Sequence, residues 1–231
     1  IYDNTQFFQT DVIGTQTVAN AVCKYVDKVE RFIHISSSEV YGSALTPHMD
    51  ENHPLNPMSP YAAAKAGADR LVYSYWRTYD IPAVIIRPFN NYGPRQHLEK
   101  VVPRFITGIV LNENLRVHGD GLSARDFIYV EDNCEVIDMI LHAPAEKVIG
   151  EVFNVGSGEH RSILSIANDL VSMMCTQKEC FIHVGDRPGQ VIRHTADISK
   201  IERILGWKPK TGGKEGLNRT VKWYTENEEW W

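Results

Sequence analysis

A tyrosine and a lysine stand four residues apart near the start of a predicted helix, in the segment Tyr61-Ala-Ala-Ala-Lys65. Side chains at positions i and i+4 lie on the same face of a helix, so the phenol and the ammonium group would be neighbours. A nearby ammonium group and the positive end of a helix both favour the phenolate form of Tyr61. Such a phenol could exchange a proton with a hydroxyl group close to neutral pH. Taken alone, this spacing is more often an ordinary pair on a helix surface.

A second group of polar residues follows a short apolar run at residues 31–36, which has the length of a strand. Polar side chains at the carboxyl end of a parallel strand lie where open α/β sheets bind ligands. Ser37 could donate a hydrogen bond to a reacting oxygen, and Glu39 could serve as a second acid or base. Tyr61 and Lys65 follow about twenty residues downstream. The combination predicts an acid–base site rather than a polar turn that ends at Gly42.

The apolar pattern around these residues alternates between helix and strand. Helical spacing predicts helices at about 5–26 and 59–79, and buried-looking strands are expected at 31–36 and 83–86. Ser59 suits the N-cap of the second helix and Pro60 its first position. Strands that alternate with helices at this spacing predict βαβ units, a parallel sheet and the α/β fold class.

The pattern is less regular beyond residue 95. Because strands and helices no longer alternate strictly, a smaller mixed region is expected to pack beside the sheet. Helices are expected at about 100–112, 131–143, 162–175, 198–205 and 213–227, and strands at 115–118, 126–130, 151–155 and 181–184.

The composition excludes several classes of protein. The 231 residues are 43% hydrophobic and 23% charged, unlike a disordered, collagen-like or coiled-coil chain. The net charge of −5 suggests no basic face for nucleic acid, and no apolar run approaches the length of a membrane span. The four cysteines show no C-x-x-C spacing, which argues against a disulfide scaffold and against a zinc site. Reduced thiols and a cytoplasmic location are the simpler interpretation, with no metal site.

One expected motif is missing. A doubly wound dinucleotide-binding fold carries a glycine-rich phosphate loop at its first strand–helix turn. Neither G-x-G-x-x-G nor G-x-x-G-x-x-G occurs in the 231 residues. Either the protein has no dinucleotide site, or this chain lacks the segment that would hold one.

Three segments, in the same order, resemble the extended short-chain dehydrogenase/reductase family. They are Ser-Ser-Ser-Glu-Val-Tyr-Gly at 36–42, Ser-Pro-Tyr-Ala-Ala-Ala-Lys at 59–65 and Arg-Pro-Phe-Asn-Asn-Tyr-Gly-Pro-Arg-Gln at 87–96. Within that family the chain is similar to the NAD-dependent nucleotide-sugar epimerases and dehydratases. The resemblance covers essentially the whole chain and continues at residues 118–121, 125–132, 153–156, 186–189 and 205–209.

The resemblance implies a Rossmann-like doubly wound parallel sheet that lacks its N-terminal part, with a smaller mixed α/β substrate-binding region. Residues 1–95 would be the C-terminal part of the NAD-binding Rossmann domain. Residues 96–231 would mainly bind the nucleotide sugar, with some later segments returning to the first domain. Since the glycine-rich loop is absent, the 231 residues expressed alone are expected to bind NAD negligibly and to be inactive.

The resemblance also implies catalytic roles. Tyr61 and Lys65 match the family's catalytic pair, with Tyr61 as the base that takes a hydroxyl proton while hydride leaves to the nicotinamide. Lys65 would also hold the nicotinamide ribose, so that both residues would contact the NAD cofactor. Ser37 matches the serine or threonine that hydrogen-bonds the same substrate oxygen.

Other matching residues would bind a nucleotide-diphosphate sugar. Asn90 matches a substrate-binding asparagine, while Arg125 and Arg187 match arginines that contact the diphosphate. A guanidinium group suits phosphate oxygens in both geometry and charge. The family resemblance further implies a homodimer formed through the helices at about 5–26 and 59–79.

The sequence departs from the family pattern at two further places. The family segment N-V-x-G-T appears here with Asp11 in place of the asparagine. Dehydratases of the dTDP-glucose type carry Thr-Asp-Glu, where the aspartate protonates the leaving hydroxyl, but this chain has Ser37, Ser38 and Glu39 there. That arrangement looks more like the GDP-mannose dehydratases and the UDP-glucuronate decarboxylases.

Three functions therefore remain open. The first is a nucleotide-sugar 4,6-dehydratase, a lyase that oxidises C4, eliminates water across C5 and C6 with Glu39 as base, and returns the hydride. The second is 4-epimerase or decarboxylase chemistry on the same scaffold, because Ser38 is a poor general acid. The third is a binding module without cofactor, which would apply if the chain were natural and complete.

Overall fold

A three-stranded parallel sheet lies at the centre of the computed structural model, which describes residues 4–174, 181–186 and 191–231. Its strands are β1 (Phe32–Ile35), β2 (Ala83–Pro88) and β7 (Val152–Val155), in the order β1-β2-β7. All six residues of β2 are buried because this strand is paired on both edges and covered on both faces. The parallel sheet expected from the sequence is confirmed.

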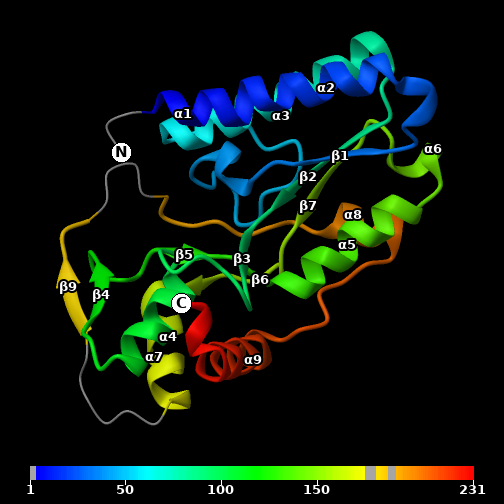
Figure 1. Ribbon diagram of the computed structural model, residues 1–231. Coiled ribbons are helices and arrows are strands. Elements are labelled where there is room, and N and C mark those ends of the chain that lie inside the picture. The colour runs from blue at the N-terminus through cyan, green and yellow to red at the C-terminus, as the bar shows by residue number, and fades with distance from the viewer. Residues whose placement is uncertain (1–3, 175–180, 187–190) are drawn as a thin grey trace.

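Helices cover both faces of this sheet (Figure 1). Successive residues of β2 point to opposite faces. Ile85 packs with Val22 and Val72 on one face, whereas Ile86 packs with Val136 and other apolar residues on the opposite face. The helices are α2 (Gly14–Lys24) and α3 (Pro60–Tyr79) on the first face, and α5 (Val130–His142) and α8 (Ser199–Leu205) on the second.

Helix α3 begins as the sequence predicts. The Ser59 hydroxyl accepts a hydrogen bond from the backbone N–H of Ala62 at 3.1 Å, and Pro60 occupies the first helical position. Both features satisfy or avoid unpaired N–H groups at the helix start. Tyr61 therefore lies in the first turn of the helix.

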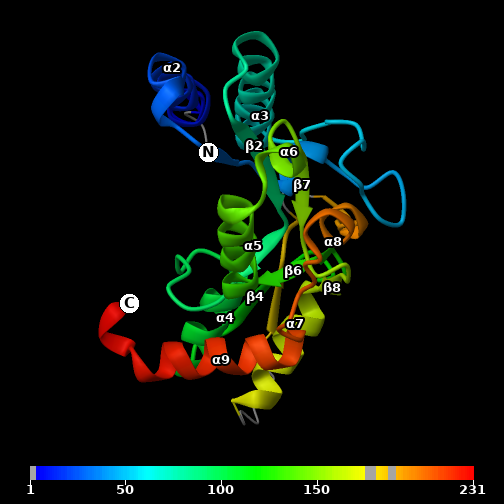
Figure 2. The same ribbon diagram turned by 90° about the vertical axis from the view of Figure 1, so that its right-hand side faces the viewer.

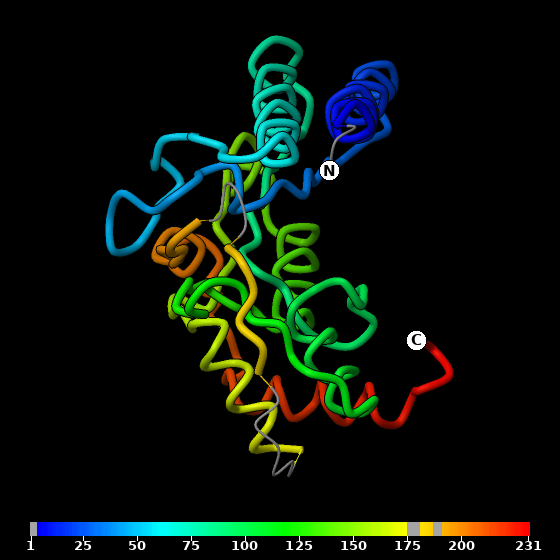
Figure 3. Tube along the Cα trace, turned by 90° about the vertical axis from the view of Figure 1, so that its left-hand side faces the viewer, coloured from blue at the N-terminus to red at the C-terminus, as the bar shows by residue number. Residues whose placement is uncertain are grey.

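The N-terminal helix differs from the single α-helix expected at about 5–26. It consists of α1 (Thr5–Phe7), a π-helical segment η1 (Phe8–Ile13) and α2. Figures 2 and 3 show that it runs beside α3 on the same side of the sheet. The two helices approach closely at Gly67, where an added Cβ would lie 3.3 Å from Cγ2 of Val12.

A second apolar core lies below the sheet in Figure 1, among α4 (Val101–Val110), α7 (Ile163–Met173) and α9 (Gly213–Glu226). The ends of the helices expected here agree with the structure to within about two residues. The remaining strands form three pairs: β3 (Asn90–Tyr92) with β6 (Phe127–Tyr129), β4 (Leu115–His118) with β9 (Phe181–Val184), and β5 (Ala124–Arg125) with β8 (Arg161–Ser162). Three strands of only two or three residues, β3, β5 and β8, were not predicted.

Four short helices lie elsewhere along the described chain: η2 (Val26–Lys28), η3 (Ser38–Tyr41), α6 (Ala145–Val148) and η4 (Glu228–Trp230).

The division into domains at residue 95 stays a prediction. Strand β7 comes late in the chain but pairs with β2, so the central sheet includes a segment from beyond residue 95. Within the described residues, no helix has both the length and the hydropathy that a membrane span requires.

A buried ion pair connects the sheet to the helix that carries Tyr61. Arg87, at the end of β2, donates from Nε to Asp69 Oδ2 at 2.8 Å and from Nη2 to Asp69 Oδ1 at 3.0 Å. Arg87 also donates to the Tyr41 hydroxyl at 2.9 Å. The two charged side chains are 2% and 0% exposed. Although burial raises the pKa of Asp69, its bonds with Arg87 hold that pKa at about 2.

We expect Asp69→Asn to lower the free energy of unfolding by about 3–5 kcal/mol, because it leaves the buried Arg87 charge without its counter-ion. The depressed pKa of Asp69 contributes stability that is present above the unfolded value near 4 and is lost as pH falls through about 2. Asp69→Asn should therefore also flatten the loss of stability between about pH 4 and pH 2. Urea unfolding followed by circular dichroism measures both effects.

The control is Arg70→Gln, because Arg70 pairs with the same carboxylate from a side chain that is 43% exposed. This variant should lose less than about 1 kcal/mol. Equal losses in both variants would contradict a special role for the buried pair.

Candidate active site

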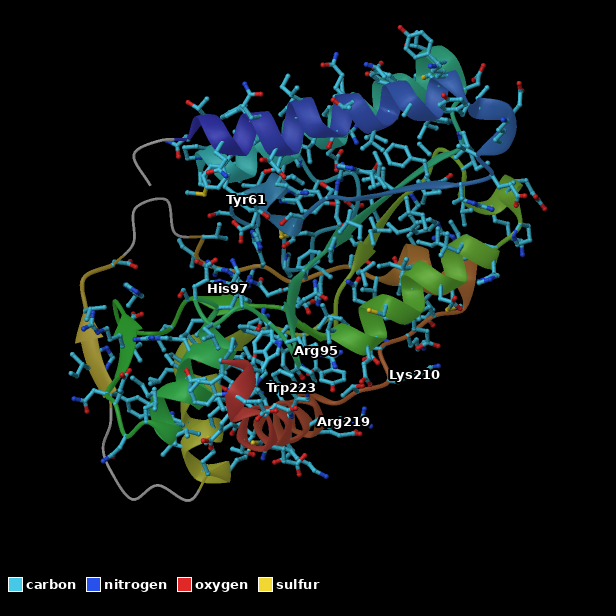
Figure 4. The ribbon with its side chains drawn as sticks, in the orientation of Figure 1. Tyr61, Arg95, His97, Lys210, Arg219 and Trp223 are labelled. Atoms are coloured by element: carbon cyan, nitrogen blue, oxygen red, sulfur yellow. The ribbon has the colours of Figure 1, made fainter. Side chains whose placement is uncertain are left out.

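Three of the predicted side chains meet at the carboxyl end of β1. Ser37 caps the short helix η3, and its hydroxyl accepts a hydrogen bond from the backbone N–H of Glu39 at 3.2 Å. As a hydrogen-bonding group Ser37 lowers the pKa of the Tyr61 hydroxyl, and the charge of the Glu39 carboxylate raises it, so both side chains lie near Tyr61. Figure 4 shows Tyr61 beneath the pair of long helices, facing the lower half of the molecule. One turn of helix and one strand end thus supply a phenol, a hydroxyl and a carboxylate.

Lys65 lies one turn further along α3. Its Nζ donates to the carbonyl oxygen of Ile35 at 2.8 Å and lies 3.9 Å from Oδ1 of Asp11. Burial lowers the pKa of Lys65, while the charges of Asp11 and Asp69 oppose that shift. The ammonium group is therefore fixed between the end of β1 and the N-terminal helix.

From Lys65 and the helix end we expected a lowered pKa for Tyr61, and this expectation is wrong because the pKa is raised. Burial raises the pKa of Tyr61, the carboxylates of Asp11 and Glu39 raise it further, and the bond with Ser37 lowers it. The spacing in the sequence could not show this, because Asp11 and Glu39 come from other elements. Because its pKa is raised, the Tyr61 phenol must lose its own proton before it can act as a base.

The remaining predicted residues surround this group less closely. Ser38 begins η3 and is 2% exposed. The backbone N–H of Asn90 donates to the carbonyl oxygen of Asp126 at 2.9 Å, and the buried Oδ1 of Asn90 has no hydrogen-bond partner among the described residues. Burial lowers the pKa of Arg125, an effect that the charge of Glu39 opposes. Arg187 lies outside the described residues.

Asp126 is a structural centre that the sequence analysis missed. Its buried carboxylate accepts backbone N–H groups from Ser157 at 2.7 Å, from Gly158 at 3.0 Å and from Ala196 at 3.1 Å. These bonds tie the segment that carries Arg125 to the loop after β7. An acidic residue inside the apolar run at 124–130 was the signal that could have identified it.

The side chains around Tyr61 fit one end of a nicotinamide cofactor. Ser36 directly follows β1, and its buried hydroxyl has no hydrogen-bond partner in the part of the chain that the structure describes. Together with Lys65 it offers polar contacts at the strand end where open α/β sheets bind ligands. Among the same residues, no group of three or more His, Cys, Asp or Glu side chains could hold a metal ion.

A cavity of about 280 Å³ lies elsewhere, beside Tyr92 and the start of α9. Its two cationic residues are already paired, Arg161 with Asp169 and Lys210 with Glu135. The candidate active site is therefore assigned from the chemistry that meets at Tyr61 rather than from this cavity.

Comparison with known proteins places this arrangement in a family. The family model described as GDP-mannose 4,6 dehydratase matches residues 1–220. The low-salt glycan biosynthesis protein Agl12 of Haloferax volcanii is 41% identical over 96% of this chain and 70% of its own length. A dTDP-glucose 4,6-dehydratase of Streptomyces niveus is 36% identical over 97% of this chain. The chain spans 66% of the length of that relative.

Solved structures agree in fold. The dTDP-glucose 4,6-dehydratase DesIV of Streptomyces venezuelae, with NAD and TYD bound, is 37% identical and superposes with a TM-score of 0.94 over all of this chain and 70% of its own. The UDP-glucuronic acid 4-epimerase of Bacillus cereus, in complex with UDP-glucuronic acid and NAD, is 31% identical with a TM-score of 0.89 over 94% of this chain and 68% of its own.

These findings confirm the Rossmann-like α/β fold and the expectation of NAD as the cofactor of this group of proteins. They also confirm the resemblance drawn from the sequence motifs. The chain belongs to the GDP-mannose 4,6 dehydratase family of NAD-dependent nucleotide-sugar dehydratases and epimerases, within the short-chain dehydrogenase/reductases.

Proposed function

We propose that the protein is an NAD-dependent nucleotide-sugar 4,6-dehydratase. The observation that carries this proposal is the pairing of two acid–base groups of different kind, the Tyr61 phenol and the Glu39 carboxylate, at one strand end. A 4-epimerase needs a single base at C4, whereas elimination of water needs a second base for the proton on C5. Glu39 is the carboxylate that can take this second role.

In the first step the phenolate of Tyr61 accepts the proton of the C4 hydroxyl, and Ser37 holds the same oxygen by a hydrogen bond. Lys65 and Tyr61 would hold the nicotinamide end of NAD, which would supply an acceptor for the hydride of C4 and the donor that returns it to C6. Glu39 then removes the proton on C5, which the C4 ketone makes acidic. That proton passes to the departing C6 hydroxyl, so that water leaves. When the hydride returns to C6, C5 takes up one proton from the solvent, and Tyr61 releases to the solvent the proton that it took from the C4 hydroxyl.

Asn90 and Arg125 support recognition of the substrate. The half-buried Arg125 donates from Nη1 to the carbonyl oxygen of Ala124 at 3.0 Å, which leaves further N–H groups for phosphate oxygens. The Asn90 Oδ1 without a partner offers an acceptor to a sugar hydroxyl. Arg187 and a cytoplasmic location stay predictions.

Epimerase or decarboxylase chemistry is the second candidate. It is favoured by Ser38, a buried serine where dTDP-glucose dehydratases carry the acid for the leaving hydroxyl. Mass spectrometry after incubation with a panel of nucleotide sugars separates the reactions. Loss of one water supports the dehydratase, loss of carbon dioxide supports the decarboxylase, and an altered sugar of unchanged mass supports the epimerase. No turnover of any sugar would favour the third hypothesis, the binding module.

We further propose a homodimer formed through the helix containing α2 and through α3. Their outer faces expose large apolar side chains, including Ile13 and Val18 on the first helix and Tyr73 on the second, at 47%, 50% and 38%. Exposed apolar patches of this kind are typical of interaction surfaces.

Tyr61→Phe should reduce turnover by about 10²- to 10⁴-fold, because the ring still packs while the acid–base group is lost. Steady-state assays on the complete protein measure this effect. The matched control is Tyr79→Phe, which removes a hydroxyl from the far end of the same helix at a site 59% exposed. Full activity in Tyr61→Phe would refute the assignment of the base.

Glu39→Gln should stop elimination but allow the first hydride transfer, since the amide cannot accept the C5 proton. Reduced cofactor should then accumulate on the enzyme, seen as nicotinamide absorbance, with dehydration slowed by about 10²-fold or more. Glu30→Gln, at an exposed position, serves as the control for loss of charge. Dehydration at the normal rate in Glu39→Gln would place the second base elsewhere.

Val18→Glu should weaken the dimer by at least about tenfold, because it would bury a charge at an apolar contact. Sedimentation velocity over a range of protein concentrations reports the association. Leu111→Glu, at the exposed end of α4, should leave association unchanged. Unaltered association in Val18→Glu would rule out this face as the interface.

A further inference from the structure

The N-terminal helix changes its hydrogen-bonding pattern where it passes the catalytic pair. In η1 the backbone follows a π-helix, and the N–H of Gly14 donates to the carbonyl oxygen of Gln9, five residues earlier. π-helical turns are rare and occur frequently at functional sites. Asp11 lies in this turn, at the position where the family pattern has asparagine.

Two side chains of this helix reach the catalytic pair. The ring of Phe7 packs edge to face against the ring of Tyr61, with centroids 5.6 Å apart. One turn later, Oδ1 of Asp11 lies 3.9 Å from Nζ of Lys65, with side chains that are 20% and 14% exposed. The helix therefore supports both members of the pair, one by packing and one by charge.

The other charged groups near Lys65 and Tyr61 are occupied or neutral. Asp69, one turn after Lys65 on α3, is bound by Arg87 and Arg70. Burial lowers the pKa of His34 on β1 to about 4, so that His34 is neutral at physiological pH. Glu39, on η3, faces the guanidinium of Arg125 and the ring of His194 as well as Tyr61.

Asp11 is therefore the one carboxylate that forms an ion pair with Lys65 among the described residues. We propose that Asp11 is a positioning residue for the catalytic pair: from the π-helical turn it anchors the Lys65 ammonium and controls the pH range in which Tyr61 accepts a proton. This inference rests on the proposed function, in which Tyr61 is the base.

The direction of the effect follows from charge. The carboxylate of Asp11 opposes ionisation of Tyr61 and offsets the positive charge of Lys65. Replacing Asp11 with a neutral amide of the same shape removes both influences. The phenolate becomes easier to form, so the pKa of Tyr61 falls.

The test compares Asp11→Asn with the wild type in the complete protein. Tyrosine labelled with ¹³C at Cζ reports the ionisation of each ring by NMR, and Tyr61→Phe identifies the signal of Tyr61. In Asp11→Asn the pKa of Tyr61 should fall by about half a unit or more. The acidic limb of the pH profile of kcat/KM should move to lower pH by a similar amount.

Two variants separate this role from a merely structural one. Asp11→Glu retains the carboxylate and should keep the pH profile within about 0.3 units of the wild type. Asp27→Asn, an exposed change of the same charge beyond the end of α2, should have no effect. Unchanged ionisation of Tyr61 in Asp11→Asn, or an equal shift in Asp27→Asn, would overturn the proposal.

The NMR titration requires no turnover, so it tests the inference independently of the proposed function. If Tyr61→Phe remained active, the assignment of Tyr61 as the base would be refuted. The NMR titration of Tyr61 in the protein with Tyr61 intact would still report the influence of Asp11. If Asp11→Asn does not fold, the outcome rests on Asp11→Glu, where a shift of half a unit or more would contradict the proposal.

Discussion

The Arg87 guanidinium joins three elements that the active site requires to be in register. It binds Asp69 of α3, the hydroxyl of Tyr41 at the end of η3, and the carbonyl oxygen of Glu51 at 3.2 Å. The hydroxyl of Tyr41 in turn donates to Asn154 of β7 at 2.7 Å. Because a buried guanidinium tolerates few arrangements of its partners, the helix with Tyr61 and the turn with Glu39 have little freedom to move apart.

The parts of the fold that local chemistry controls were predictable from the sequence. Ser59 and Pro60 determine where α3 begins, and the apolar run at 83–86 indicates a buried strand. The short pairing of β5 with β8 was missed, because two-residue strands have no periodicity to detect. The π-helical turn was missed for a similar reason, since its apolar residues also fit an ordinary α-helix.

The candidate site was predictable in its members but not in its electrostatics. Tyr61, Lys65, Ser37 and Glu39 were recognisable from motif and spacing, and the structure brings them to one strand end. The direction in which the pKa of Tyr61 shifts was not predictable, because the shift depends on burial and on Asp11, which lies fifty residues away in the chain. Dehydratases and epimerases share this fold, so the fold alone does not determine the reaction, and the proposed assignment rests on individual side chains such as Ser38 and Glu39.

The π-helical turn also determines which residues of the N-terminal helix can face α3. An α-helix has 3.6 residues per turn, so side chains spaced by four residues drift around its axis by about 40° at each step. Phe7 and Asp11 have this spacing and yet both contact α3, while Ala19 further on is still buried. The wider turn absorbs the drift and keeps the two halves of the helix in phase. If the same residues formed a regular α-helix, the part of the helix that carries Phe7 would be rotated by roughly 100° and Phe7 would turn away from Tyr61. The extra residue that η1 accommodates therefore keeps Phe7 directed at Tyr61.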